Sequence, residues 1–120
     1  MRKTVILIIA CFLLCGCGET KKEATIQKID CAKTQELVND GAILVDVRSV
    51  FEYEHYHLDN AINIDVQVIE NVIEEQIPDK KTKIIEYCQS GSRSNNAANI
   101  LIEKGYTNVY DLGSIDNCEN

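Results

Sequence analysis

Tryptophan is absent from this 120-residue chain, and its aromatic side chains are five tyrosines and two phenylalanines. A hydrophobic core must therefore be built mostly from aliphatic side chains. The chain also lacks an excess of basic residues, since its formal net charge is -7. A nucleic-acid-binding surface needs clustered positive charge, so this composition excludes a charge-driven nucleic-acid partner. The length is that of one small domain.

The N-terminal hydrophobic run, residues 5–14, is too short to span a bilayer, which takes roughly 20 helical residues. It follows a basic start and fits a secretory signal. The next residues, Leu14-Cys15-Gly16-Cys17, resemble the bacterial lipobox, whose last cysteine receives the lipid. The pattern predicts a lipoprotein signal peptide (1–16), a palmitate-type modification of Cys17 and a flexible tether (17–25). We expect a lipid-anchored protein on the extracytoplasmic face of a bacterial cell membrane, with no other membrane contact; an uncleaved signal anchor is the alternative.

The cysteines leave an odd number in the predicted mature domain. Of the six in the chain, two would leave with the signal peptide and Cys17 would carry the lipid, so Cys31, Cys88 and Cys118 remain. At least one thiol therefore stays unpaired in an oxidising location. There is no Cys-x-x-Cys spacing, which disfavours a thiol–disulfide oxidoreductase.

Short β-rich runs alternate with helical patterns along residues 26–118, with no internal repeat. Strands are expected at 26–29, 42–47, 61–64, 83–87 and 109–112, and helices at 32–39, 49–56, 66–77 and 94–104. Such alternation predicts an α/β fold, with a small parallel sheet of about five strands covered by helices on both faces.

Cys88 lies directly between a predicted strand and a predicted helix, where sites of open α/β sheets form. Gly91 gives the loop the backbone freedom to turn its amide groups inward as an anion-binding nest. The positive end of the following helix and the guanidinium of Arg93 add to this field. All three effects favour a thiolate over a thiol, so Cys88 is the expected nucleophile and needs no general base.

Three sequence blocks resemble the single-domain rhodaneses. The first is the loop motif Cys88-x-x-Gly91-x-Arg93-Ser94, which matches the family's active-site loop. The others are Asp46-Val47-Arg48-Ser49 with Glu52-Tyr53 and 57–64, and the C-terminal block 110–115. Together they cover residues 26–118, so a rhodanese-like domain is expected over that range.

The resemblance implies a sulfurtransferase that uses neither a metal nor an organic cofactor. Cys88 would take the outer sulfur of an anion such as thiosulfate, hold it as a persulfide and pass it to a thiol or cyanide. The substrate-binding residues would be Gln89, Ser90, Gly91, Ser92, Arg93 and Ser94. Asp46 and Arg48 are candidate supporting residues, because Asp46 could orient Arg93 or the loop amides, or pair with Arg48.

The C-terminal end of the domain departs from the family pattern, and one position in a predicted strand, Glu86, carries a separate expectation. Cys118 stands where many relatives have a tryptophan, and the usual final helix is missing or vestigial. We expect Cys118 near the rim of the active site, where it could close a reversible disulfide with Cys88 or accept its sulfur. The alternatives are that it only fills the space of the missing tryptophan or that it pairs with Cys31. Glu86 is expected to point away from Cys88 and to be solvated.

Other functions remain open from the sequence. The cell-cycle dual-specificity phosphatases share this fold, but their loop has five residues between cysteine and arginine, enough to hold a phosphate. Here four residues separate Cys88 from Arg93, and the smaller ring suits a sulfur atom. A non-catalytic persulfide carrier and an extracytoplasmic thiol-redox module are the remaining alternatives.

Overall fold

The computed structural model describes residues 24–119. The predicted signal peptide (1–16), Cys17 and most of the predicted tether (17–25) lie outside the described residues. Within residues 24–119, no helix is both long enough and apolar enough to cross a membrane.

Five parallel strands form one sheet in the order β1-β5-β4-β2-β3. The strands are β1 (Gln27–Lys28), β2 (Ile43–Asp46), β3 (Ile62–Asn63), β4 (Lys83–Cys88) and β5 (Asn108–Ser114). The helices are α1 (Cys31–Asn39), α2 (Val50–His55), α3 (Ile69–Gln76), α4 (Ser92–Glu103) and the 3-10 helix η1 (Ile115–Cys118). The predicted α/β architecture is therefore confirmed, and η1 takes the place of a full final helix.

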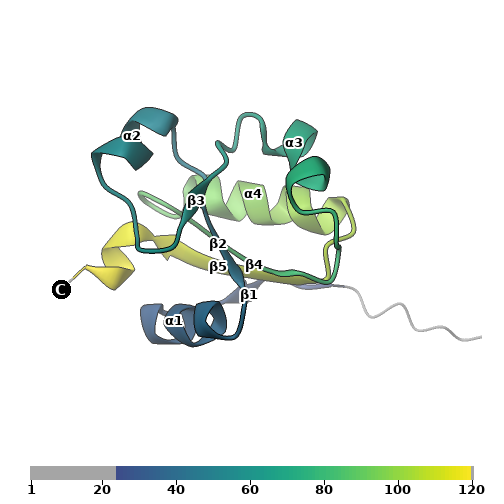
Figure 1. Ribbon diagram of the computed structural model, residues 1–120, viewed down its shortest axis with the longest axis horizontal. Coiled ribbons are helices and arrows are strands. Elements are labelled where there is room, and N and C mark those ends of the chain that lie inside the picture. The colour runs from purple at the N-terminus through teal and green to yellow at the C-terminus, as the bar shows by residue number, and fades with distance from the viewer. Residues whose placement is uncertain (1–23, 120) are drawn as a thin grey trace, which may run out of the picture.

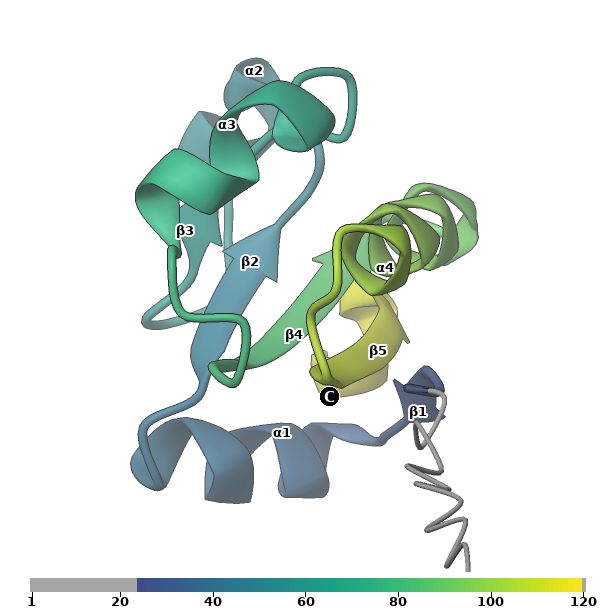
Figure 2. The same ribbon diagram turned by 90° about the vertical axis from the view of Figure 1, so that its right-hand side faces the viewer.

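Helices cover both faces of the sheet. Figures 1 and 2 show α1 on one side of the sheet, and α3 and α4 on the other. Consecutive residues of β4 point to opposite faces, so Ile84 packs in the core under α3 and α4, and Ile85 packs in the core beside α1 and η1. Because both faces are covered, β2 begins with three consecutive apolar residues, Ile43-Leu44-Val45, rather than alternating apolar and polar ones.

Local polar side chains set where α1 and α2 begin. The carboxylate of Asp30 accepts a hydrogen bond from the Lys33 amide at 2.8 Å and caps α1. Ser49 and Glu52 form a capping box at the start of α2. The third helix starts at Ile69, three residues later than its predicted start at 66, because the chain first makes a turn in which the Val68 and Ile69 amides bond to the Asp65 carbonyl.

The last strand runs further than predicted and carries a β-bulge. Glu86 pairs with Asp111, but Tyr87 pairs with Gly113, so Leu112 is the extra residue. Gly113 has a φ of 81°, which favours glycine, and its amide donates to the Asp111 carboxylate at 2.8 Å. The strand then continues to Ser114, opposite Cys88. The bulge therefore brings the end of β5 beside the residue predicted to be the nucleophile.

Glu86 is fully buried, so the prediction that it is solvated was wrong. Residues two apart in a strand share a face, which places Glu86 on the same side of β4 as Cys88 rather than opposite to it. Neither carboxyl oxygen has a hydrogen-bond partner among the described residues. Burial, and secondarily the neighbouring Asp111 on β5, raise the pKa of Glu86 well above its ordinary value. The surroundings of this side chain therefore favour the neutral acid over the carboxylate.

We predict that Glu86→Gln gains stability relative to the wild type as the pH rises. The folded protein keeps a proton on Glu86 that the unfolded chain releases, so this stabilisation is complete below the ordinary glutamate pKa and is lost as the pH rises through the raised one. The difference should grow by at most about 1.4 kcal/mol per pH unit, the slope for one proton. Urea unfolding between about pH 4 and pH 8 measures it. The exposed Glu75→Gln is the control, and equal pH dependence in both variants would contradict the prediction.

Candidate active site

Cys88 ends β4 and is fully buried at the foot of the loop that leads into α4. The amide of Gly91 donates to the Cys88 sulfur, with 3.0 Å between nitrogen and Sγ. Gly91 also starts α4 with a φ of 99°, in the left-handed region, and no side chain caps this end of the helix. The first-turn amides of α4 therefore have no intrahelical acceptor, and the positive end of the helix dipole lies next to the sulfur. These surroundings suit an anionic sulfur or a bound anion.

The predicted substrate-binding residues other than Gly91 and Arg93 divide into an exposed group and one buried residue. Gln89, Ser90 and Ser92 are exposed and available to a ligand. Ser94 is fully buried, and its hydroxyl donates to the Gly91 carbonyl at 3.1 Å. The structure therefore makes Ser94 a support of the loop conformation, where a substrate contact was expected.

Arg93 was expected to add a positive charge to the loop, and in the structure this charge is paired with Glu52 of α2. Its two terminal nitrogens donate to the two carboxylate oxygens at 2.6 and 3.0 Å. The hydrogen bond from Arg93 is the main cause that lowers the pKa of Glu52 to about 2. The Ser49-x-x-Glu52 spacing is a sequence signal for a helix start, yet it says nothing of a partner on α4. The pair joins the start of α2 to the start of α4.

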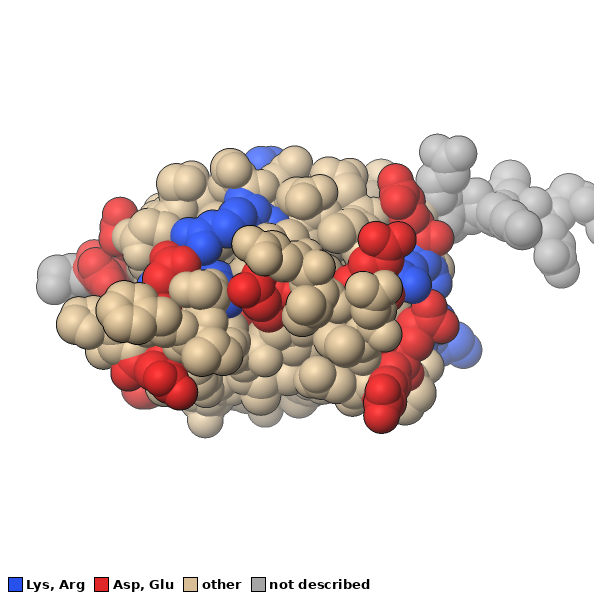
Figure 3. Space-filling view, turned by 90° about the horizontal axis from the view of Figure 1, so that it is seen from above, with Lys and Arg blue, Asp and Glu red and all other residues tan. Residues whose placement is uncertain are grey.

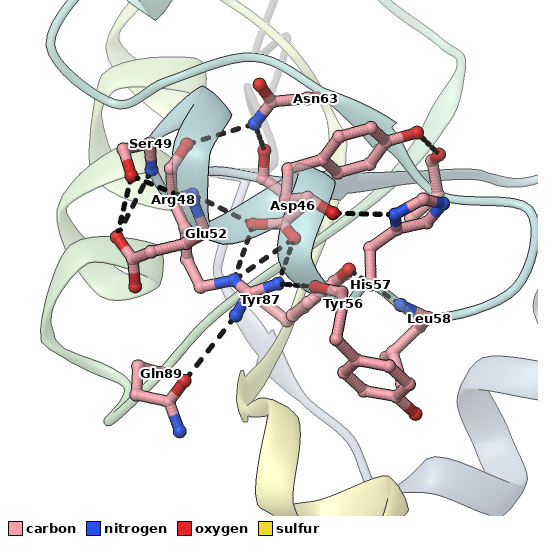
Figure 4. A network of polar contacts seen from close by, with 12 residues as sticks. Asp46, Arg48, Ser49, Glu52, Tyr56, His57, Leu58, Asn63, Tyr87 and Gln89 are labelled. Carbon is pink, nitrogen blue, oxygen red and sulfur yellow. Dashed lines mark hydrogen bonds and ion pairs between the residues drawn. The ribbon is translucent and has the colours of Figure 1, made fainter.

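Asp46 and Arg48 form a buried ion pair with each other, which decides between the two roles left open for Asp46. Arg48 Nη2 lies 2.7 Å from Asp46 Oδ2, and the side chains are 5% and 0% exposed. The guanidinium also donates to the Tyr56 carbonyl at 2.6 Å and, at 3.4 Å, to the Gln89 side chain. In Figure 4 the Arg48 head group lies between Asp46, Tyr56 and Gln89. Arg48 therefore links the end of β2, the end of α2 and the loop after Cys88.

Two more residues fix this edge of the sheet, and the sequence analysis gave neither of them a role. The Asn63 amide donates to the carbonyls of Asp46 and Arg48 at 3.0 and 2.9 Å (Figure 4). The Tyr87 hydroxyl accepts from the Leu58 amide at 3.1 Å, and burial raises the pKa of this phenol. Their partners lie at least 15 residues away in the sequence, so no local pattern could have pointed to them.

A cavity of about 370 Å³ opens beside the loop. Phe51 and Tyr56, which are exposed apolar side chains, form part of its wall. The rest of its lining consists of the buried Ile115 and five polar residues, Arg48, Glu52, His55, Gln89 and Glu119. Cys88 does not line this cavity, so a molecule bound there would lie next to the covered sulfur rather than on it.

The predicted disulfide between Cys88 and Cys118 is wrong. Cys118 pairs with Cys31, with Cα atoms 5.1 Å apart, and Cys88 is the one unpaired cysteine in residues 24–119. Cys118 packs with the core on the α1 side of the sheet, and Cys88 packs with the core on the α4 side. The sheet therefore separates the sulfur of Cys88 from that of Cys118. The alternative prediction, that Cys118 pairs with Cys31, is confirmed.

The face of the molecule shown in Figure 3 carries no extended basic patch. Basic side chains form short groups on this face, and acidic side chains lie on several sides of them. Arg48 and Arg93, the two arginines closest to the loop in the contacts above, are each matched by a carboxylate. An anion at the loop would thus meet chiefly backbone amides rather than a broad positive surface.

Comparison with known proteins assigns the chain to a family. The sequence profile of the rhodanese-like domain matches residues 30–118. The chain is 37% identical over 71 residues to thiosulfate sulfurtransferase PspE of Escherichia coli K12, covering 59% of this chain and 68% of that protein. It is 31% identical over 86 residues to thiosulfate sulfurtransferase GlpE of Pseudomonas syringae, covering 72% and 79%. The chain therefore belongs to the rhodanese-like domain family.

The same domain occurs in larger proteins and in solved structures. The chain is 33% identical over 97 residues to a tRNA uridine(34) hydroxylase of Hamiltonella defensa, but spans only 26% of that protein. A structure of a rhodanese with anions from E. coli superposes with a TM-score of 0.61 at 34% identity, covering 64% of this chain and 91% of that one. The reduced CoADR-RHD protein of Bacillus anthracis gives 0.68 at 27% identity, covering 77% and 16%.

We predict that Asp46→Ala destabilises the protein by about 3–5 kcal/mol, because it leaves the Arg48 charge buried without a partner. The double variant Asp46→Leu/Arg48→Met should lose much less, since it removes both charges and restores apolar volume. Chemical denaturation measures both. Glu36→Ala, which breaks an exposed pair with Lys33, is the control and should change the free energy of unfolding far less. A double variant as unstable as Asp46→Ala would refute the account.

Proposed function

We propose that the chain is a sulfurtransferase that moves a sulfane sulfur from an anion such as thiosulfate, through a persulfide on Cys88, to a thiol or cyanide. The observation that carries this proposal is the Gly91 amide held 3.0 Å from the Cys88 sulfur at the uncapped start of α4. Relatives named thiosulfate sulfurtransferases support the choice of donor. No cofactor or metal enters the reaction.

In the first half-reaction the Cys88 thiolate attacks the outer sulfur of thiosulfate. A bond forms between the two sulfurs, the bond to the inner sulfur breaks, and sulfite leaves with the electron pair. Cys88 then carries a persulfide. Amides of the loop and of the first turn of α4 stabilise the negative charge, as an oxyanion hole does. Proton removal by a neighbouring base is unnecessary, because the nucleophile reacts as its anion.

The donor reaches the sulfur by displacing weakly held side chains. The exposed Gln89 side chain makes two long contacts, 3.4 Å to Arg48 and 3.5 Å to Asp116, and both are near the limit for a hydrogen bond. Arg93 and Glu52 are 36% and 30% exposed, so water screens their attraction and an incoming dianion can compete for the guanidinium. The loop thus opens without breaking the buried Asp46–Arg48 pair.

In the second half-reaction an acceptor thiolate or cyanide attacks the outer sulfur of the Cys88 persulfide. The bond between the two sulfurs of the persulfide breaks, Cys88 leaves as a thiolate, and the acceptor becomes a persulfide or thiocyanate. The cavity beside the loop gives the acceptor a place to bind, and its wall at Phe51 and Tyr56 favours an acceptor that has an apolar part.

Cys88→Ser is predicted to abolish thiocyanate formation from thiosulfate and cyanide while the fold remains intact, because serine is close to cysteine in size. Intact-protein mass spectrometry after thiosulfate treatment should show one added sulfur on the wild type and none on the variant. Circular dichroism checks the fold. Full turnover by Cys88→Ser would contradict the proposal.

Sulfur uptake, sulfur turnover and phosphate-ester hydrolysis, measured side by side, separate the alternative functions. Uptake of one sulfur without turnover would indicate a persulfide carrier instead of an enzyme. Hydrolysis of a phosphate ester, in the absence of sulfur transfer, would indicate phosphatase chemistry.

We also propose that the domain is held at the extracytoplasmic face of a bacterial membrane by lipid on Cys17, in keeping with the motif Leu14-Cys15-Gly16-Cys17. The variant Cys17→Ala should release the protein from the membrane fraction or leave the precursor unprocessed. Fractionation of cells followed by mass measurement of the N-terminal peptide tests this. Processing and membrane retention equal to those of the wild type would argue against a lipid at this position.

A further inference from the structure

The end of β5 and the 3-10 helix η1 close one side of the loop that follows Cys88. The Ser114 hydroxyl donates to the Gln89 carbonyl at 2.6 Å, and the Gln89 side chain reaches Asp116 at 3.5 Å. Ser114 also pairs with Cys88 in the sheet. A Cβ atom placed on Gly91 would lie 3.8 Å from Gly113 Cα, so the two backbones are in contact range. The loop therefore rests on residues 113–116.

The helix η1 has only four residues, and so short a 3-10 turn is not stable without outside contacts. Ile115 anchors it by burial, and the Ser114 hydroxyl accepts from the Asp116 amide at 3.1 Å. Its last residue, Cys118, is joined by the disulfide to Cys31, the first residue of α1. One end of η1 is thus fixed by the sheet and the other by a covalent bond to a helix on the face opposite Cys88.

We propose that η1 is a positioning element for the Cys88 loop, that Ser114 is its positioning residue, and that the Cys31–Cys118 disulfide keeps it in place. Sulfur transfer would then depend on the oxidation state of a bridge that never touches the reacting sulfur. This inference rests on the function proposed above. It assigns to the disulfide a role beyond that of bracing the fold.

The change of state is a simple exchange. A dithiol reductant gives two electrons and two protons to the bridge, which becomes two thiols, while the dithiol becomes a disulfide. Cys118 then loses its covalent link to α1, and the single turn of η1 frays from its free end. When the turn unwinds as far as Asp116, the Asp116 amide no longer donates to the Ser114 hydroxyl. That hydroxyl is then held less firmly against the Gln89 carbonyl, and the Gly91 amide less firmly against the Cys88 sulfur.

The test uses the full-length chain and the variants Cys31→Ser, Cys118→Ser, Ser114→Ala and Ser114→Thr. We expect the first three to lower kcat/KM for thiosulfate by about three- to tenfold, the loss expected for one hydrogen bond. Ser114→Thr, which keeps the hydroxyl, should retain activity. Wild-type protein reduced with a dithiol and freed of it should fall to the level of Cys31→Ser and recover on reoxidation, whereas Cys31→Ser/Cys118→Ser should not respond.

A second readout does not need the proposed function to be correct. The rate at which iodoacetamide alkylates Cys88, followed by peptide mapping, reports how well the loop covers the sulfur. Removal of the bridge or of the Ser114 hydroxyl should raise this rate at least about threefold. If the wild type shows no sulfur transfer, the proposed function fails, and the alkylation rates alone decide the positioning role.

The matched control is Tyr106→Phe. Its hydroxyl donates to the carbonyls of Ile73 and Ile77, beyond the end of α4 that lies away from the loop. This variant should lose stability while kcat/KM and Cys88 alkylation stay unchanged. If the cysteine and serine variants behave in the same way, with lower stability but unaltered activity and alkylation, the bridge only braces the fold and the inference is overturned.

Discussion

The buried ion pair between Asp46 and Arg48 governs the geometry of the whole carboxyl edge of the sheet. A guanidinium cannot remain in the protein interior without a matching carboxylate, so the chain after β2 turns back until Arg48 meets Asp46. The remaining donors of Arg48 then hold the end of α2 at Tyr56 and approach the loop at Gln89. With α2 fixed in this way, Glu52 comes to lie opposite Arg93. The position of the Cys88 loop thus follows from charges that do not contact the sulfur.

Because both arginines are matched by carboxylates, the field at Cys88 is made chiefly of oriented amide dipoles. Such dipoles act over a short range, at the end of α4 and at Gly91. This explains how a chain with a formal charge of -7 can present a local site for an anion without a basic surface. It also favours a small ligand, since four residues between Cys88 and Arg93 enclose little space. The raised pKa of Glu86, on the same face of β4, fits this arrangement, because an ionised carboxylate there would oppose negative charge at Cys88.

Local pattern was enough to predict the order of strands and helices, and it placed Cys88 at the end of a strand because a β-rich run, a cysteine and a helical pattern follow one another. What local pattern could not supply was contact over long sequence separation. Glu52 meets Arg93 across 41 residues, and Cys31 meets Cys118 across 87. The β-bulge at Leu112 also left no mark in the spacing of apolar residues. The error at Glu86 had a different origin: strand alternation was applied with the wrong parity, because residues two apart in a strand share a face and Glu86 therefore lies on the same side as Cys88. The role of Cys17 stays a prediction.

The bridge between Cys31 and Cys118 also gives the domain a particular mechanical topology. Cys31 directly follows β1 and its short connection, whereas Cys118 follows the last strand. Consider a pulling force applied between the chain ahead of β1 and the chain after Cys118. It would first detach the two-residue edge strand β1 and then reach the disulfide. From there the load would pass through a covalent bond to Cys118 and bypass β2 to β5, which stay inside a closed ring. The domain should therefore resist extension from its N-terminal side without relying on the shear strength of its sheet.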